Sequence, residues 1–187
     1  QRFEPPSEKR QRLRVVLIFG SPGVGKSEVG RIVAERLGLR LIELAELAGG
    51  EEADMRTVSV RAGSMLRREG GVVVSHIPFK PRGLMPRRVI VLRRNPLELV
   101  EVLRSRGYSR EKVRENVEAE LIDYVYVRAL EIYGPRRTVQ IRTSGRTKEE
   151  VAERVLRALR GELRSEEVDW IGELEANGSL EGLLRLL

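Results

Sequence analysis

The chain reads Gly20-Ser21-Pro22-Gly23-Val24-Gly25-Lys26-Ser27 directly after an apolar run at residues 13–19. A helical pattern follows, in which one face carries Val29, Ile32, Val33 and Leu37. This is the strand, glycine loop and helix order of a phosphate-binding loop. A glycine-rich turn can also serve only to link a strand to a helix, but the spacing and both flanking elements favour phosphate binding. The segment therefore predicts a site for a nucleoside triphosphate or a closely similar molecule.

The residue types within this loop have separate tasks. Glycines let successive backbone N–H groups point inward around the phosphates, at the positive end of the following helix. Lys26 is expected to reach the β- and γ-phosphates, and the Ser27 hydroxyl to ligate Mg²⁺. The predicted cofactors are thus ATP and Mg²⁺, with Ser27 as the predicted metal ligand. The predicted nucleotide-binding residues are Gly23, Val24, Gly25, Lys26, Ser27 and Glu28.

The composition limits the protein class. A length of 187 residues with 41% hydrophobic and 34% charged residues is typical of one soluble globular domain. The longest apolar runs have the length of a strand, and residues 1–14 lack an apolar signal region, so we expect a cytoplasmic protein without a membrane partner. The absence of cysteine excludes disulfides, thiol catalysis and cysteine-ligated zinc. A single histidine argues against a histidine-based metal site.

The net charge of +7 comes mostly from arginine, because only five of the 35 basic residues are lysines. Such a positive field favours polyanions such as nucleotides, RNA or an acidic partner. The alternative is a solvated surface with arginines in ion-pair networks, as in a thermophile. Acidic residues are interspersed through most of the chain, so both interpretations stay open.

The hydrophobic pattern predicts an α/β fold. We expect strands at residues 13–19, 39–42, 72–74, 88–92 and 138–141, and helices at 26–37, 60–68, 96–105, 109–133 and 148–159. Residues 43–48 fit one or two helical turns, 49–58 have no clear assignment, and 77–86 form a loop. Short apolar strands that alternate with helices predict a five-stranded parallel sheet with helices on both faces. Ligands bind beyond the carboxyl ends of such strands, so the glycine loop and His76 should share one cleft.

A second segment carries a family resemblance. It reads Arg104-Ser105-Arg106-Gly107-Tyr108 and continues through Lys112, Asn116, Glu118 and Glu120. This stretch resembles the atypical adenylate kinase family of isoenzyme-six type, whose archaeal and eukaryotic members also act as ATPases in small-ribosomal-subunit maturation. Further matching pieces are Leu92-Arg93 ahead of Pro96, residues 69–73 before His76, and Asp169-Trp170-Ile171. The resemblance covers about residues 13–171.

The resemblance implies an organisation and an activity. It implies a P-loop nucleoside monophosphate kinase-like domain at residues 13–165 with a short lid at about 104–116, after a flexible lead-in at 1–12 and before a helical tail at 166–187. The implied reaction is ATP + AMP to 2 ADP, with ATPase activity and a link to small-subunit maturation. The implied partners are AMP, a small-subunit ribosomal protein and, as a further candidate, rRNA.

The resemblance also implies catalytic roles. Lys26 holds the donor phosphates, and Arg106, less firmly Arg104, neutralises charge on the transferred phosphoryl group. A solvated helix end is the alternative for these arginines, and packing is favoured for Tyr108. His76 would orient a water or a phosphate oxygen. The implied catalytic residues are therefore Lys26, His76 and Arg106.

The sequence departs from the family pattern at one place. The family has an acidic residue just before this histidine as a Mg²⁺ partner, where this chain has Val74 and Ser75. Without that carboxylate Mg²⁺ is held more loosely and turnover falls. Glu43, Glu46 and Asp54 are candidate replacements.

Two alternatives to an efficient adenylate kinase follow. One is a nucleotide-switched ribosome assembly factor with weak or no kinase activity. The other is a small-molecule kinase of the shikimate or dephospho-coenzyme A type, which shares the core architecture but is not supported by the lid motif.

Overall fold

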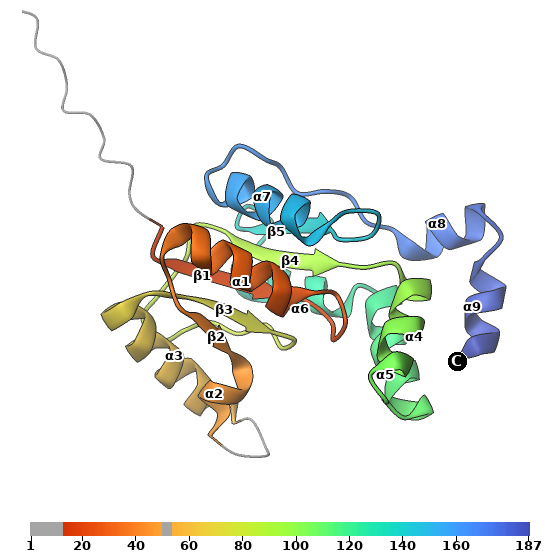
Figure 1. The fold of residues 1–187 in the computed structure, drawn as a ribbon, viewed down its shortest axis with the longest axis horizontal. Coiled ribbons are helices and arrows are strands. Elements are labelled where there is room, and N and C mark those ends of the chain that lie inside the picture. Colours follow the sequence, from red (N-terminus) through yellow and green to blue (C-terminus); the bar gives the residue numbers. More distant parts are fainter. Residues whose placement is uncertain (1–12, 50–53) are drawn as a thin grey trace, which may run out of the picture.

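A computed structural model describes residues 13–49 and 54–187. The predicted lead-in at 1–12 and part of the unassigned stretch at 49–58 therefore lie outside the described residues. The strands form one sheet in the order β2-β3-β1-β4-β5, and every neighbouring pair is parallel (Figure 1). They are β1 (Val15–Phe19), β2 (Leu41–Glu43), β3 (Gly71–Ser75), β4 (Val89–Arg93) and β5 (Thr138–Arg142). The predicted five-stranded parallel sheet is confirmed.

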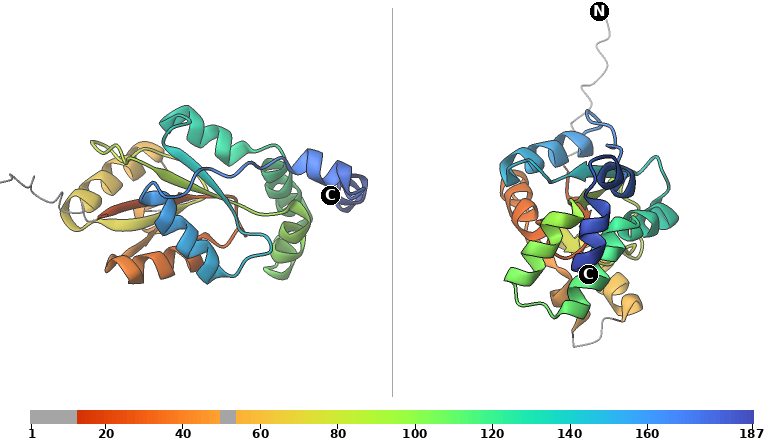
Figure 2. Two further views of the ribbon diagram at one scale, coloured as in Figure 1. Left: turned by 90° about the horizontal axis from the view of Figure 1, so that it is seen from above. Right: turned by 90° about the vertical axis from the view of Figure 1, so that its right-hand side faces the viewer.

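Helices cover both faces of this sheet, as the view from above in Figure 2 shows. One face carries α1 (Lys26–Leu37) and α7 (Lys148–Leu159), and the other carries α2 (Leu44–Ala48), α3 (Met55–Glu69) and α6 (Tyr124–Tyr133). Alternate residues of β1 supply the two apolar clusters, because successive side chains of a strand point to opposite faces. Val16 and Ile18 belong to the first cluster, and Leu17 and Phe19 to the second.

The remaining helices lie beyond the carboxyl ends of the strands (Figure 1). They are α4 (Pro96–Ser105), α5 (Arg110–Leu121), α8 (Trp170–Ala176) and α9 (Leu180–Leu186). The tail is anchored by Trp170, Leu174 and Leu183, which are buried in the same apolar cluster as α4 and α5. Over the described ranges, no helix is long and apolar enough to cross a membrane.

The predicted single helix at 109–133 is wrong. The chain forms α5 and α6, separated by Ile122 and by Asp123, whose φ of 62° lies in the left-handed region. Val117 and Leu121 are buried with α1 and α7, whereas Val125 is buried on the opposite face of the sheet. The apolar residues Val113, Val117, Leu121 and Val125 recur every four residues, a spacing that is typical of one buried face of one helix. They do not form one face here, because the chain turns around the edge of the core between the two helices.

The helix predicted at 60–68 begins earlier. Its first residue is Met55, because Asp54 caps the helix. The Asp54 carboxylate accepts hydrogen bonds from the backbone N–H of Arg56 at 3.1 Å and from the Thr57 hydroxyl at 2.9 Å. The polar residues at its start hid this turn from the hydrophobic pattern.

Candidate active site

The glycine loop connects the end of β1 to the start of α1. Gly23 and Gly25 have φ of 89° and 95°, a backbone conformation that favours glycine. A Cβ at Gly23 would also lie 3.2 Å from the side chains of Leu99 and Leu103. The loop is thus shaped by glycine, and it lies at the carboxyl edge of the sheet, as the sequence predicted.

A cavity of about 630 Å³ opens beside this loop. Its walls come from the loop, from the β2–α2 junction, from the end of β3, and from the segment that joins α4 to α5. Five of the predicted site residues line it: Gly23, Lys26, Ser27, His76 and Arg106. The glycine loop and His76 therefore do share one cleft.

The other predicted nucleotide-binding residues do not line the cavity. Val24 is buried in the first apolar cluster. Gly25 is the residue directly before α1. Glu28 is exposed in the first turn of that helix, where an acidic side chain interacts favourably with the helix dipole.

The cavity is cationic. The Lys26 ammonium donates a hydrogen bond to the Ser21 carbonyl oxygen at 3.2 Å. Burial, and then the nearby Arg106 guanidinium, lower the pKa of Lys26 to about 8. Partial burial and the charge of Lys26 also lower the pKa of His76, so its imidazole is neutral at pH 7. An anionic ligand would relieve the repulsion between Lys26 and Arg106.

The segment predicted to form a lid, residues 104–116, has its basic residues in two different environments. Arg106 faces the cavity, together with Lys112 and Asn116 of α5. Arg104 lies elsewhere, because its guanidinium donates to the Leu186 carbonyl oxygen at 3.1 Å. Tyr108, for which the sequence favours packing, is 38% exposed and lines the cavity.

The residues before His76 offer no carboxylate. Val74 is 3% exposed, and the Ser75 hydroxyl donates to the Ile77 carbonyl oxygen at 2.7 Å and accepts from the Ile77 N–H at 3.0 Å. Ser75 therefore caps a local turn. The sequence leaves the position of the acidic Mg²⁺ partner vacant, and the structure adds no acid there.

The three candidate replacement acids differ in position. Glu43 lines the cavity, and its charge raises the pKa of Lys26 against the larger effect of burial. Glu46 pairs with Arg40 at 2.5 Å, and Asp54 caps α3. Among the described residues no group of three or more His, Asp or Glu side chains could hold a metal alone. Mg²⁺ accepts few protein ligands when phosphates and waters supply the rest, so Ser27 with Glu43 fits that ion.

The comparisons with known proteins agree with this geometry. A family model described as an AAA domain matches residues 16–123. A Thermococcus kodakarensis protein named "Putative adenylate kinase" is 35% identical over 168 residues, which is 83% of this chain and 92% of that protein. The chain belongs to the family of archaeal proteins named putative adenylate kinase. An Archaeoglobus fulgidus protein of the same name is 35% identical over 173 residues, 86% of this chain and 94% of that protein.

Solved structures confirm that the family member has a P-loop kinase fold. A shikimate kinase from Acinetobacter baumannii covers 80% of this chain and 94% of its own, with a TM-score of 0.54 and 19% identity. A gluconokinase from Sinorhizobium meliloti covers 81% of this chain and 94% of its own, with a TM-score of 0.53 and 19% identity. At such identities the likeness concerns the fold alone.

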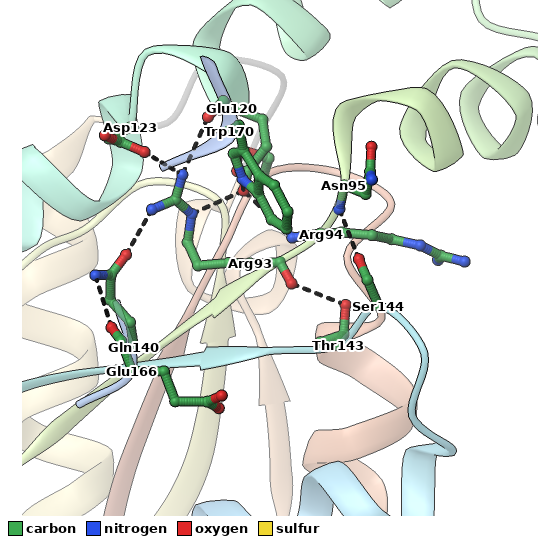
Figure 3. Close-up of polar contacts among 11 residues, drawn as sticks. Arg93, Arg94, Asn95, Glu120, Asp123, Gln140, Thr143, Ser144, Glu166 and Trp170 are labelled. Atoms are coloured by element: carbon green, nitrogen blue, oxygen red, sulfur yellow. Dashed lines mark hydrogen bonds and ion pairs between the residues drawn. The ribbon is translucent and has the colours of Figure 1, made fainter. Parts of the chain in front are cut away.

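Behind the glycine loop, this family member has a buried polar cluster for which no role was predicted from the sequence (Figure 3). Arg93 and Glu120 are each 1% exposed, and the Arg93 Nε donates to the Glu120 carboxylate at 2.7 Å. The guanidinium also donates to Gln140 and Asp123. The Trp170 indole N–H donates to the Glu120 carboxylate at 3.0 Å. The segments that carry the family resemblance contain Arg93, Glu120 and Trp170. The sequence did not indicate that these three side chains lie together in the fold.

Proposed function

We propose that the protein is an ATP-dependent nucleoside monophosphate kinase that converts ATP and AMP to two ADP, with an accompanying ATPase activity. The observation that carries this proposal is the single cavity in which Lys26 of the glycine loop and Arg106 of the lid lie close together. The β2–α2 junction bounds the same cavity, and the acceptor nucleotide would lie beside it. The names of the archaeal relatives support the same reaction.

Positioning and charge stabilisation would perform the transfer. An oxygen of the acceptor phosphate attacks the γ-phosphorus of ATP, the bond to the β–γ bridging oxygen breaks, and ADP leaves. Lys26 and Arg106 would neutralise the charge on the transferred group from two sides. The charge of Arg106 lowers the pKa of Lys26, and a phosphate that binds both cations would relieve their mutual repulsion.

The chain's own residues also suit Mg²⁺. The ion supplies charge neutralisation and alignment of the phosphate oxygens. The Ser27 hydroxyl would bind it directly, and Glu43 would accept hydrogen bonds from its water ligands. His76, neutral at pH 7, can accept a hydrogen bond from a water or donate one to a phosphate oxygen.

A turnover assay tests the kinase proposal. Purified protein is incubated with ATP, Mg²⁺ and each of AMP, GMP, CMP and UMP, and diphosphate products are separated by ion-exchange chromatography. We expect ADP formation that requires AMP and that is lost in Lys26→Ala. A product yield equal to that of Lys26→Ala with every monophosphate contradicts the proposal.

We further propose that the protein takes part in small-ribosomal-subunit maturation, as a switch if its turnover is weak. The missing carboxylate at Val74 and Ser75 favours the switch. Many surface arginines are paired, such as Arg36 with Glu153. A second hollow of about 490 Å³ has no acidic residue in its lining within the described structure. It has four basic ones, Arg56, Lys80, Arg82 and Arg128, of which Arg128 pairs with Glu131. This hollow suits an RNA or acidic protein partner.

Pull-down with and without ATP tests the ribosomal link. We expect the wild type to recover a small-subunit ribosomal protein, and Arg56→Glu/Lys80→Glu to lose it. Arg157→Glu/Arg160→Glu, an exposed double charge reversal at the C-terminal end of α7, is the control for net charge. Failure of the wild type to recover a ribosomal protein or rRNA under both conditions contradicts this part of the proposal.

A further inference from the structure

Helix α5 presents three polar residues at intervals of four, which places them on one helical face. Lys112 and Asn116 line the cavity. Glu120, one turn further on, is 1% exposed and lies behind the glycine loop. The same face of one helix therefore contacts the ligand space with its first two residues and the back of the loop with its third.

The Glu120 carboxylate joins four parts of the chain. Its Oε2 accepts from the Ser21 hydroxyl in the glycine loop at 2.8 Å. Its Oε1 accepts from Arg93 Nε at 2.7 Å, from Trp170 Nε1 at 3.0 Å and from the Arg94 backbone N–H at 3.2 Å. A buried carboxylate that accepts four hydrogen bonds is held in one position, so it fixes the distances between its donors.

Ser21 itself has a second contact, on the side of the cavity. Its carbonyl oxygen accepts from the Lys26 ammonium at 3.2 Å, while its hydroxyl donates to Glu120. A phosphate that binds Lys26 competes for that ammonium and so acts directly on Ser21. The contacts form an unbroken series from Lys26 through Ser21 and Glu120 to the indole of Trp170.

We propose that Glu120 is a positioning residue that sets the glycine loop against α5, and that Ser21 links phosphate binding at Lys26 to Glu120 and Trp170. The proposal rests on the proposed kinase function for its effect on turnover. The proposed link to Trp170 does not depend on the kinase function, because it requires only that the cavity bind a nucleotide. Without the Ser21 hydroxyl, the glycine loop is no longer held in a fixed position relative to Lys112 and Asn116, and the reacting groups are misaligned.

The hydrogen bond between Ser21 and Glu120 can be removed while the other contacts of the buried polar cluster remain. In Ser21→Ala, Arg93 keeps its contacts with Glu120, Gln140 and Asp123. The loop also keeps its contact from Arg94, whose Nη1 donates to the Gly23 carbonyl oxygen at 2.9 Å. Glu120→Gln is the second variant, because it retains the side-chain shape and removes the charge.

Fluorescence of Trp170, the single tryptophan of the chain, measures the link directly. ADP is titrated into the full-length protein while emission is recorded, and binding is measured separately by isothermal titration calorimetry. We expect a saturable emission change in the wild type. In Ser21→Ala we expect calorimetric binding to persist and the emission change to be lost. In the kinase assay we expect kcat to fall about tenfold, with a smaller change in the KM for ATP, because misalignment of reacting groups lowers the rate of the chemical step.

Matched controls separate positioning from a general loss of structure. Ser59→Ala removes a hydroxyl that donates to the Lys80 carbonyl oxygen, and Glu118→Gln changes an exposed glutamate of the same helix that pairs with Arg114. Both should keep the wild-type emission change and kcat. An emission change and kcat in Ser21→Ala equal to the wild type would overturn the proposal, as would a wild type that binds ADP without an emission change. If the wild type binds ADP and shows the emission change but forms no diphosphate from any monophosphate, the kinase function fails and the link stands.

Discussion

The two sides of the cavity differ in how completely they are built. On the side of the glycine loop and the predicted lid, positive charge comes from Lys26, Arg106 and Lys112, and the glycines of the loop have the required conformation. On the side of β2 and β3, Glu43 is the one carboxylate that lines the cavity within the described residues. Ser75 is engaged with Ile77. The site is thus better equipped to hold phosphate than to hold a metal.

This difference shows how phosphate binding can persist where phosphoryl transfer is weak. Phosphate binding depends on local loop geometry and on cations, both of which are present. Efficient transfer also depends on how firmly Mg²⁺ is held, which here would depend on Ser27 and on a glutamate from another strand. Substitutions on the two sides should therefore have different signatures, and those on the cationic side should have the larger effects.

Substitution of Lys26 should have the largest effect. Lys26→Ala removes the cation nearest the predicted phosphate position, so we expect kcat/KM for ATP to fall about a thousandfold. Steady-state kinetics with ATP and AMP measure this fall. Lys148→Ala, at the exposed start of α7, should match the wild type. A fall of less than tenfold in Lys26→Ala would show that the cationic side is not the phosphate site.

Substitution of the two arginines of the predicted lid should affect kcat to different extents. Arg106→Ala removes a charge that faces the cavity, so we expect kcat to fall about a hundredfold. Arg104→Ala breaks a contact with the Leu186 carbonyl oxygen on the far side of α4, so kcat should change less than about threefold. Equal losses in the two variants, measured at saturating ATP and AMP, would contradict the placement of Arg106.

Glu43 and Glu46 test the metal side. Glu43→Gln should raise the Mg²⁺ concentration needed for half-maximal stabilisation of bound ATP about tenfold. Thermal denaturation at fixed ATP and varied Mg²⁺ measures this without turnover. Glu46→Gln loses an exposed pair with Arg40 and should leave the Mg²⁺ dependence unchanged. If Glu43→Gln also leaves it unchanged, this glutamate does not replace the missing acid.

The pH dependence of ADP binding should show the smallest effect. The pKa of Lys26 in the free protein is about 8, and a bound phosphate raises it again. Binding above that pH therefore takes up a proton, and affinity should fall about threefold between pH 7.5 and 8.5. Lys26→Arg keeps its charge over this range, so its affinity, even if lower, should not depend on pH. Calorimetric titration of both proteins would reveal a flat wild-type profile if Lys26 does not titrate.

The sequence predicts most of the cationic side, because it depends on local patterns. The glycine loop, the strand before it and the helix after it are adjacent in the chain, so their geometry follows from residues 13–37. The position of His76 followed from the parallel sheet, whose strands end at one edge. Arg106 was placed by a family resemblance in a contiguous segment.

The features that the sequence did not reveal depend on distant contacts. The break between α5 and α6 depends on the left-handed Asp123, which contacts Arg93 of β4. The spacing of Lys112, Asn116 and Glu120 was visible, but the partners that bury Glu120 come from the glycine loop, β4 and the tail. No local pattern distinguishes Glu43 from Glu46, because β2 and α2 must first be packed against β3.

Transfer of a labelled phosphoryl group tests the central claim most directly. ATP labelled at its γ-phosphate is incubated with the protein, Mg²⁺ and AMP, and the products are separated. The kinase proposal predicts that label appears in ADP, that it requires AMP, and that Lys26→Ala abolishes it. Label that appears only in inorganic phosphate, at a rate independent of AMP, would contradict phosphoryl transfer to AMP and favour a nucleotide-hydrolysing switch.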